Sequence, residues 1–122
     1  MARLGRAILF AKDLARMVAF YRSALQLPVV SDDPGFVVLG ESGMELALHE
    51  IPARFARDIE IADPPVPRSK TPVKLVFAVA DLDDARDRFA AAGGIIGEPW
   101  SIGDRRLADG TDPEGNVIQL TE

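Results

Sequence analysis

One pattern of elements occurs twice along the chain, and this internal repeat limits the possible folds more than any other feature. An apolar run over residues 7–12 ends at Asp13, and apolar residues then recur at helical spacing as far as Leu25. A second apolar run, residues 73–79, ends at Asp81 and leads into a similar periodic stretch that Gly93 and Gly94 close. Aspartate is a favoured helix N-cap because its carboxylate accepts hydrogen bonds from free backbone N–H groups. Both halves therefore predict a strand, a turn and a helix.

Three short β-type runs separated by turn residues follow each predicted helix. They cover residues 28–31, 36–39 and 44–49 in the first half, and residues 95–100, 105–108 and 117–121 in the second. Each half is thus a βαβββ module, with module 1 at residues 4–50 and module 2 at residues 73–122. The residues between them, 51–72, contain five prolines mixed with charges, which favours an extended connector.

The length of the chain favours one domain that contains both modules. A chain of 122 residues can bury a core of its own, and a content of 48% hydrophobic residues is typical of a globular protein. A half-sheet with one helix would leave one face uncovered, so the halves must complete each other, or a second chain must help. We predict a single α+β domain, residues 1–122, with two tandem βαβββ modules forming a curved mixed sheet around a cup.

Composition excludes several classes of function. The chain has no cysteine, which excludes disulfides, thiolate metal sites and a cysteine nucleophile. Its net charge of -5, with no stripe of Lys and Arg, argues against nucleic-acid binding. No segment has the length and apolarity of a membrane span, and the first residues do not resemble a signal peptide, so we expect a cytoplasmic protein and no membrane partner.

Alternation along the strands predicts which side chains face the cup. In residues 73–79 the more apolar set should pack under the helix, which leaves Lys74 on the other face. The same division leaves Glu45 and Gln119 on that face, whereas the first strand is ambiguous and Arg6 is assigned by analogy with Lys74. We expect these four side chains to converge, with His49 further along the face of Glu45. The alternative is that they lie at a rim or face solvent.

Six segments carry a family resemblance. They are Asp13–Leu14, Val18–Arg22, Leu25–Pro28, Glu45–His49, Phe77–Leu82 and Asp112–Leu120. Together they resemble the vicinal oxygen chelate superfamily, which includes glyoxalases, bleomycin-resistance proteins, fosfomycin-resistance enzymes and extradiol dioxygenases. The resemblance covers nearly the whole chain and implies a cup for a small molecule.

The resemblance also implies where a metal would bind. Relatives similar to glyoxalase use His or Gln in the first and fifth strands and Glu in the fourth and eighth, and these positions match Arg6, Lys74, Glu45 and Gln119. Arginine and protonated lysine have no lone pair to offer, and with Glu45 they already sum to one positive charge, which would repel a dication. We therefore expect no metal cofactor. The two cations would instead attract a carboxylate, phosphonate or enolate group, or one would form an internal salt bridge with Glu45.

Further residues have both a functional and a structural interpretation. His49, the only histidine, is either a general base near Glu45 or a plain residue at a strand end. Phe36 and Trp100 either wall an apolar binding site or pack in the core. Tyr21 is expected in the core, and residues 112–116 as a tight turn and not a calcium loop.

These observations favour binding of a small anionic or aromatic organic molecule in the cup, either by a sequestering resistance-type protein or by a metal-independent relative of the enzymes. Catalysis stays open; an enzyme would have glyoxalase-like lyase or dioxygenase-like activity, with Glu45 and His49 as its catalytic residues. One alternative is a metal-dependent lyase or dioxygenase using Glu45, His49 and Gln119. Another is a noncatalytic module in which residues 51–72 bind a partner protein. We expect a homodimer, because such relatives often build each cup from two chains and exposed sheet edges need cover.

Overall fold

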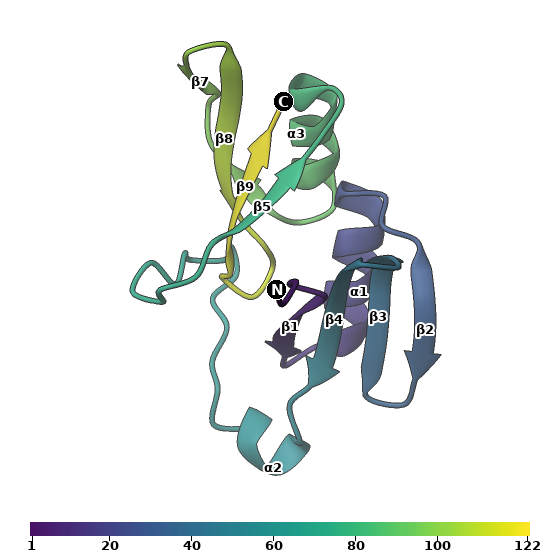
Figure 1. Ribbon diagram of the computed structural model, residues 1–122. Helices are drawn as coiled ribbons and strands as arrows, with labels where there is room; N and C mark the ends of the chain where they lie inside the picture. The colour runs from purple at the N-terminus through teal and green to yellow at the C-terminus, as the bar shows by residue number, and fades with distance from the viewer.

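The computed structural model describes residues 1–122 and contains the predicted repeat (Figure 1). Module 1 consists of β1 (Arg6–Ala11), α1 (Leu14–Ala24), β2 (Val29–Asp33), β3 (Phe36–Glu41) and β4 (Met44–Glu50). Module 2 consists of β5 (Leu75–Ala78), α3 (Leu82–Ala91), β6 (Ile95–Ile96), β7 (Trp100–Ile102), β8 (Arg105–Thr111) and β9 (Val117–Thr121). The α+β class with two tandem βαβββ modules is confirmed, except that the strand expected at residues 95–100 is divided into β6 and β7.

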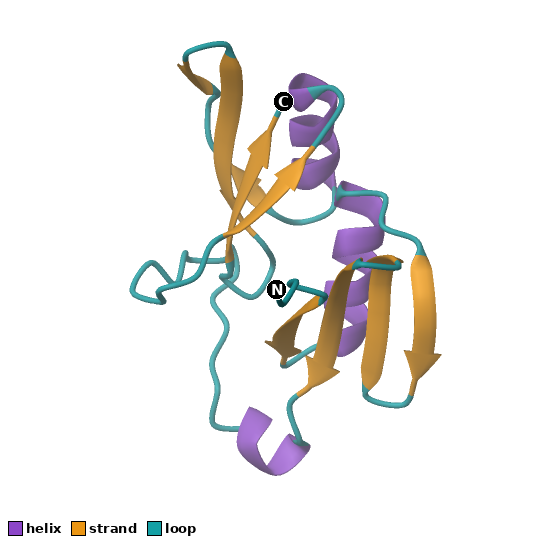
Figure 2. Cartoon of the chain, viewed as in Figure 1, coloured by secondary structure: helices purple, strands orange, loops and turns teal.

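Each module has a sheet of its own, and the two sheets have the same plan (Figure 2). The strand order is β1-β4-β3-β2 in module 1 and β5-β9-β8-β6 in module 2, where β7 also pairs with β8. In both modules the first strand runs parallel to the last, and the remaining pairs are antiparallel. The strands β1 and β5 are therefore equivalent, and each forms an edge of its sheet.

Both long helices begin at the aspartates expected to cap them. Asp13 accepts a hydrogen bond from the backbone N–H of Arg16 at 3.1 Å, and Asp81 accepts one from Asp84 at 2.9 Å. After α3, Gly93 has φ +104°, a conformation that glycine adopts without steric cost. None of the helices is both long and apolar enough to cross a membrane.

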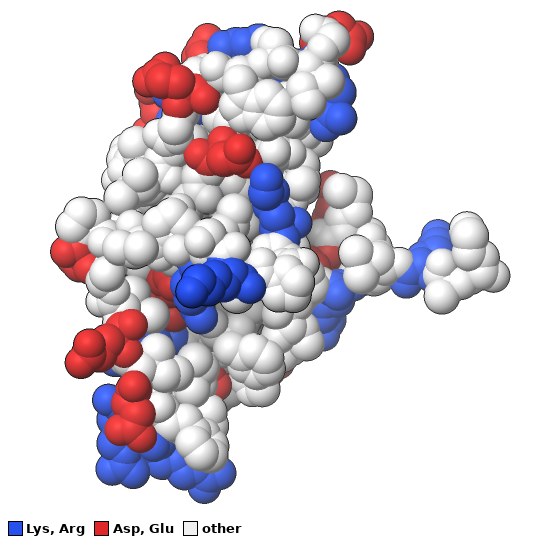
Figure 3. Space-filling model, turned by 90° about the vertical axis from the view of Figure 1, so that its left-hand side faces the viewer, with Lys and Arg blue, Asp and Glu red and all other residues white.

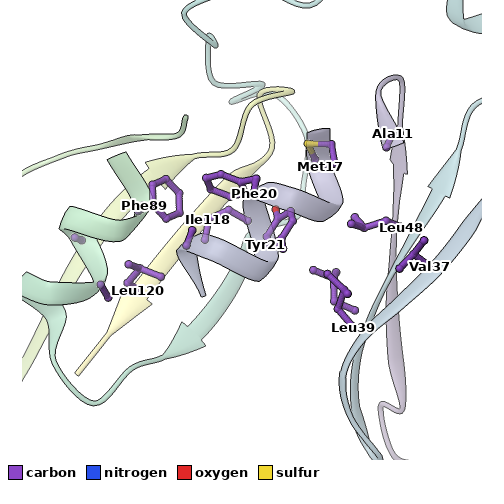
Figure 4. Packing of buried hydrophobic residues seen from close by; sticks show 14 of the residues in the cluster. Ala11, Met17, Phe20, Tyr21, Val37, Leu39, Leu48, Phe89, Ile118 and Leu120 are labelled. Carbon is purple, nitrogen blue, oxygen red and sulfur yellow. The ribbon is translucent and has the colours of Figure 1, made fainter. Parts of the chain in front are cut away.

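A single hydrophobic core joins the modules. In Figure 4 the side chains of α1 lie between those of the two sheets, and the ring of Phe20 meets that of Phe89 edge to face at 4.9 Å. The core also contains Leu48 from module 1 and Leu120 from module 2. The helix-covered face of each sheet turns toward this core, so the other face, called the open face below, turns away from it.

The connector between the modules contains one element that the sequence did not predict, the short helix α2 (Ala53–Ala56). It begins after Pro52, where a chain with good helix formers can complete one turn. The connector is tied to both modules: the Lys12 ammonium donates to the carbonyl of Ile59, and the N–H of Arg68 donates to the carbonyl of Gly115 at 2.8 Å.

Candidate ligand-binding site

The open face of module 1 carries alternate residues of β1. Arg6, Ile8 and Phe10 are exposed, whereas the residues between them turn toward the core. This confirms the side assigned to Arg6 by analogy. The parallel register of β1 and β4 then places Arg6 opposite Glu45, and Phe10 opposite His49.

Arg6 and Glu45 form an ion pair on this face. The Nε of Arg6 donates to Oε2 of Glu45 at 2.8 Å, and its Nη2 lies 2.7 Å from the same oxygen. The guanidinium carbon lies 5.8 Å from the ring centroid of Phe36. Such charge-assisted contacts hold both side chains in place. Of the two interpretations of Arg6, the internal salt bridge is the one present in the structure.

His49 packs between two aromatic rings. Its ring centroid lies 5.4 Å from that of Phe10 and 5.2 Å from that of Phe36, and these three residues are called the aromatic patch below. His49 and Glu45 are four positions apart in β4, which corresponds to about 13 Å along a strand. The structure therefore surrounds His49 with rings and places it away from Glu45, and its role as a general base stays a prediction.

The open face of module 2 carries a second polar cluster. The ammonium of Lys74 lies 3.2 Å from Oδ1 of Asp109, and Nε2 of Gln119 donates to the same oxygen at 3.0 Å. Asp109 pairs directly with Gln119 across β8 and β9. Sequence reasoning missed Asp109 because the strand was expected to end at Ala108, whereas β8 continues to Thr111. Alternation continued from Arg105 would have placed Asp109 on this face.

The four residues expected to converge form two clusters within one chain. Arg6 and Glu45 lie on the module 1 sheet, while Lys74 and Gln119 lie on the module 2 sheet with Asp109. No hydrogen bond or ion pair joins one cluster to the other. The charge count also changes, because Asp109 gives each cation its own carboxylate. The charged groups of the two clusters sum to zero, and the expected surplus positive charge disappears.

The two aromatic residues assigned to a binding wall both border open faces. Trp100 pairs with Leu107, which in turn pairs with Thr121, so Trp100 lies on the face of Gln119. Trp100 is 40% exposed. Phe36 is half-buried and belongs to the aromatic patch. Both are positioned to contact a ligand on these faces, and that contact stays a prediction.

The chemistry of these side chains does not fit a divalent ion. Arg6 and Lys74 have no lone pair, and the carboxylates of Glu45 and Asp109 each bind a cationic side chain. No group of three or more His, Asp or Glu side chains is arranged to hold a metal. The alternative ligand set of Glu45, His49 and Gln119 is divided between two sheets.

Two buried carboxylates after β8 fix the modules to each other. As expected, residues 112–116 form a turn, in which the N–H of Gly115 donates to the carbonyl of Asp112 at 3.0 Å. Asp112 also accepts the hydroxyl of Tyr21 at 2.6 Å, and Glu114 accepts the N–H groups of Lys12 and Asp13 at 2.7 and 2.8 Å. Burial and the adjacent charge of Asp112 raise the pKa of Tyr21. These contacts confirm that Tyr21 is a core residue.

A surface groove of about 1000 Å³ lies elsewhere, along α1. Its lining mixes the cations Lys12, Arg16 and Arg22 with the acids Asp32 and Glu50. It includes no residue of either open-face cluster. The face seen in Figure 3 likewise has acidic and basic side chains interspersed over an uncharged surface.

Comparison with known proteins agrees with the architecture. A model of the Glyoxalase/Bleomycin resistance protein/Dioxygenase superfamily matches residues 3–120. A solved protein of unknown function from Agrobacterium tumefaciens str. C58 is 25% identical, with a TM-score of 0.72 over 100% of this chain and 94% of that one. Among proteins with curated descriptions, none matches this chain.

Two further solved structures share the fold at lower identity. A glyoxalase-related enzyme from Fulvimarina pelagi is 17% identical, with a TM-score of 0.73 over 99% of this chain and 88% of that one. TnmS3, an antibiotic binding protein from Streptomyces sp. CB03234, is 20% identical, with a TM-score of 0.70 over 98% of this chain and 94% of that one. The matched model, the tandem βαβββ modules and these structures agree. The chain belongs to the Glyoxalase/Bleomycin resistance protein/Dioxygenase superfamily.

Proposed function

We propose that this protein binds a small aromatic organic molecule on its open faces, without a divalent metal. The observation that carries the proposal is the aromatic patch, in which the exposed Phe10 and the neighbouring rings of Phe36 and His49 form an apolar surface beside a neutralised ion pair. Ile8 and Val76 extend the exposed apolar surface over both sheets. Exposed apolar patches bordered by polar groups are typical of binding sites. Of the two ligand classes expected from the sequence, the charge balance favours the aromatic one over the anionic one.

The proposed cup is completed by a second copy of the chain. Each sheet has one face in the shared core, so the open face of each sheet is left uncovered within a single chain. The edge strands β1 and β5 have backbone groups available for pairing. If β1 of one chain lies beside β5 of the other, one wall comes from module 1 and the opposite wall from module 2. This arrangement would bring the two polar clusters to one site.

We place sequestration ahead of catalysis. His49, the only histidine, packs against two rings and not against an acid. A protein named for antibiotic binding, TnmS3, has the same fold, which is compatible with this role. A cytoplasmic location stays a prediction.

The test uses the neutral aromatic dye Nile red and the single tryptophan, Trp100. We expect saturable dye fluorescence, quenching of Trp100, and the same affinity with and without EDTA. Phe10→Ala should weaken binding about five- to thirtyfold, the equivalent of one to two kcal/mol of lost contact. Phe55→Ala is the matched control, since Phe55 of α2 is 55% exposed and Phe10 is 60% exposed. Equal affinities in the two variants, or affinity lost with EDTA, would contradict the proposal.

A further inference from the structure

A comparison of the two modules singles out Asp109. In module 1 the carboxylate partner of Arg6 is Glu45, on the strand parallel to β1. In module 2 the strand parallel to β5 is β9, whose neutral Gln119 lies opposite Val76, two residues beyond Lys74. The carboxylate lies one strand further, at Asp109 of β8, 3.2 Å from the ammonium of Lys74. Each open face thus has one pair of a cation and a carboxylate, although the positions differ.

We propose that Asp109 determines ligand specificity by cancelling the charge of Lys74, so that the site takes uncharged aromatic molecules and discriminates against anions. The inference rests on the proposed function and names the property of the ligand that the site selects. The side chains of Lys74 and Asp109 are 44% and 46% exposed, so a bound molecule can reach both. Without Asp109, the charge of Lys74 would be uncompensated and would attract a sulfonate or carboxylate.

The orientation of Gln119 agrees with an uncharged ligand. Because Nε2 of Gln119 donates to Asp109, its carbonyl oxygen turns away and is free to accept a hydrogen bond from a ligand N–H or O–H. The remaining cation on this face, Arg105, donates to Thr121 at 3.2 Å. It is four positions from Asp109 in β8, about 13 Å along the strand, so at physiological salt its charge is largely screened from the Asp109 cluster.

The experiment compares two dyes, neutral Nile red and anionic 8-anilinonaphthalene-1-sulfonate, in full-length variants. Asp109→Asn keeps the shape of the side chain and should raise the affinity for the anionic dye about three- to tenfold, while that for Nile red stays within about twofold. Lys74→Gln should lower the affinity for the anionic dye by a similar factor, and the double variant should bind this dye with the wild-type affinity. The gain should shrink in 1 M salt, where the Debye length falls to about 3 Å.

Asp104→Asn is the matched control, because it removes the same charge from the exposed turn between β7 and β8. Unchanged affinity for the anionic dye in Asp104→Asn supports a local effect, whereas an equal rise in both variants overturns the inference. Unchanged affinity in Asp109→Asn, with Nile red still bound, also overturns it and leaves the proposed function standing. Failure of Nile red to bind the wild type overturns the proposed function instead. If Asp109→Asn does not fold, Lys74→Gln decides the question alone.

Discussion

The phenol of Tyr21 is fully buried, and its single strong partner, Asp112, also accepts N–H groups from Glu114 and Asn116. Because burial and the charge of Asp112 raise the pKa of Tyr21, the folded state keeps the phenolic proton at a pH where the unfolded chain loses it. The stability from this group is therefore complete below about pH 10, the ordinary tyrosine pKa, and falls as pH rises beyond it. Urea unfolding between pH 8 and 11 should show this decline in the free energy of unfolding.

Tyr21→Phe is the control for this effect. It removes one hydrogen bond from Asp112 and should lower the free energy of unfolding at pH 8 by about 1–3 kcal/mol. Its own stability should then fall less steeply above pH 10, because the titrating phenol is absent. A slope identical to that of the wild type would assign the decline to other groups.

Single residues also show where sequence reasoning succeeds and where it stops. Alternation placed Arg6 and Lys74 on the open faces correctly, because a strand exchanges faces at every residue. It missed Asp109, since the apolar run ends at Ala108 and Gly110 looks like a turn residue. Gly110 is instead part of β8, and a Cβ there would lie 2.9 Å from the ring of Phe89. The ring of Phe89 from α3 packs against Gly110 within the strand. This contact between distant parts of the chain cannot be read from the local sequence.

At the scale of elements, the junction of α3 with β6 depends on close approach. A Cβ on Gly94 would lie 2.5 Å from Cε1 of Phe89 and 2.8 Å from Cε2 of Phe20, the two rings that join the modules. Gly94→Ala should therefore lower the free energy of unfolding by about 1–3 kcal/mol through overpacking. Thermal unfolding of Gly5→Ala serves as the control, because Gly5 has nothing within 4 Å. Equal melting temperatures for the two variants would mean that the rings move aside at little cost.

The helices were easier to predict than the strand ends for a physical reason. An N-cap aspartate and a 3.6-residue period are local signals, and both long helices began where Asp13 and Asp81 predicted. The end of a strand depends instead on its neighbour: the run expected at residues 73–79 is paired only over β5, while β8 extends three residues past the expected end. The helix α2 was not predicted, because the prolines around it favoured an extended connector.

At the scale of the whole molecule, the sequence predicted the tandem modules but not how their open faces are arranged. The repeat and its apolar pattern follow from local order, whereas the relative placement of the sheets depends on α1 packing against α3 through Phe20 and Phe89. The expected convergence of Arg6, Glu45, Lys74 and Gln119 required a particular placement of the two sheets, which local sequence patterns do not determine. Within one chain the four residues are divided between two sheets, so their convergence now depends on the association of two chains.

That association is testable through two edge residues of similar exposure. Ile8 on β1 is 47% exposed, and Val30 on β2, at the opposite edge of the same sheet, is 49% exposed. We expect the wild type to sediment at about twice the mass of one chain, because the open faces and the edges of β1 and β5 are covered in the proposed dimer. Ile8→Asp would place a charge in that apolar contact, so it should shift the protein to monomer and abolish Nile red binding, whereas Val30→Asp should leave both unchanged. Circular dichroism checks that both variants are folded.

A wild type that stays monomeric at micromolar concentration and still binds the dye would contradict the proposed dimer. The site would then be confined to a single open face, with the aromatic patch of module 1 as its centre.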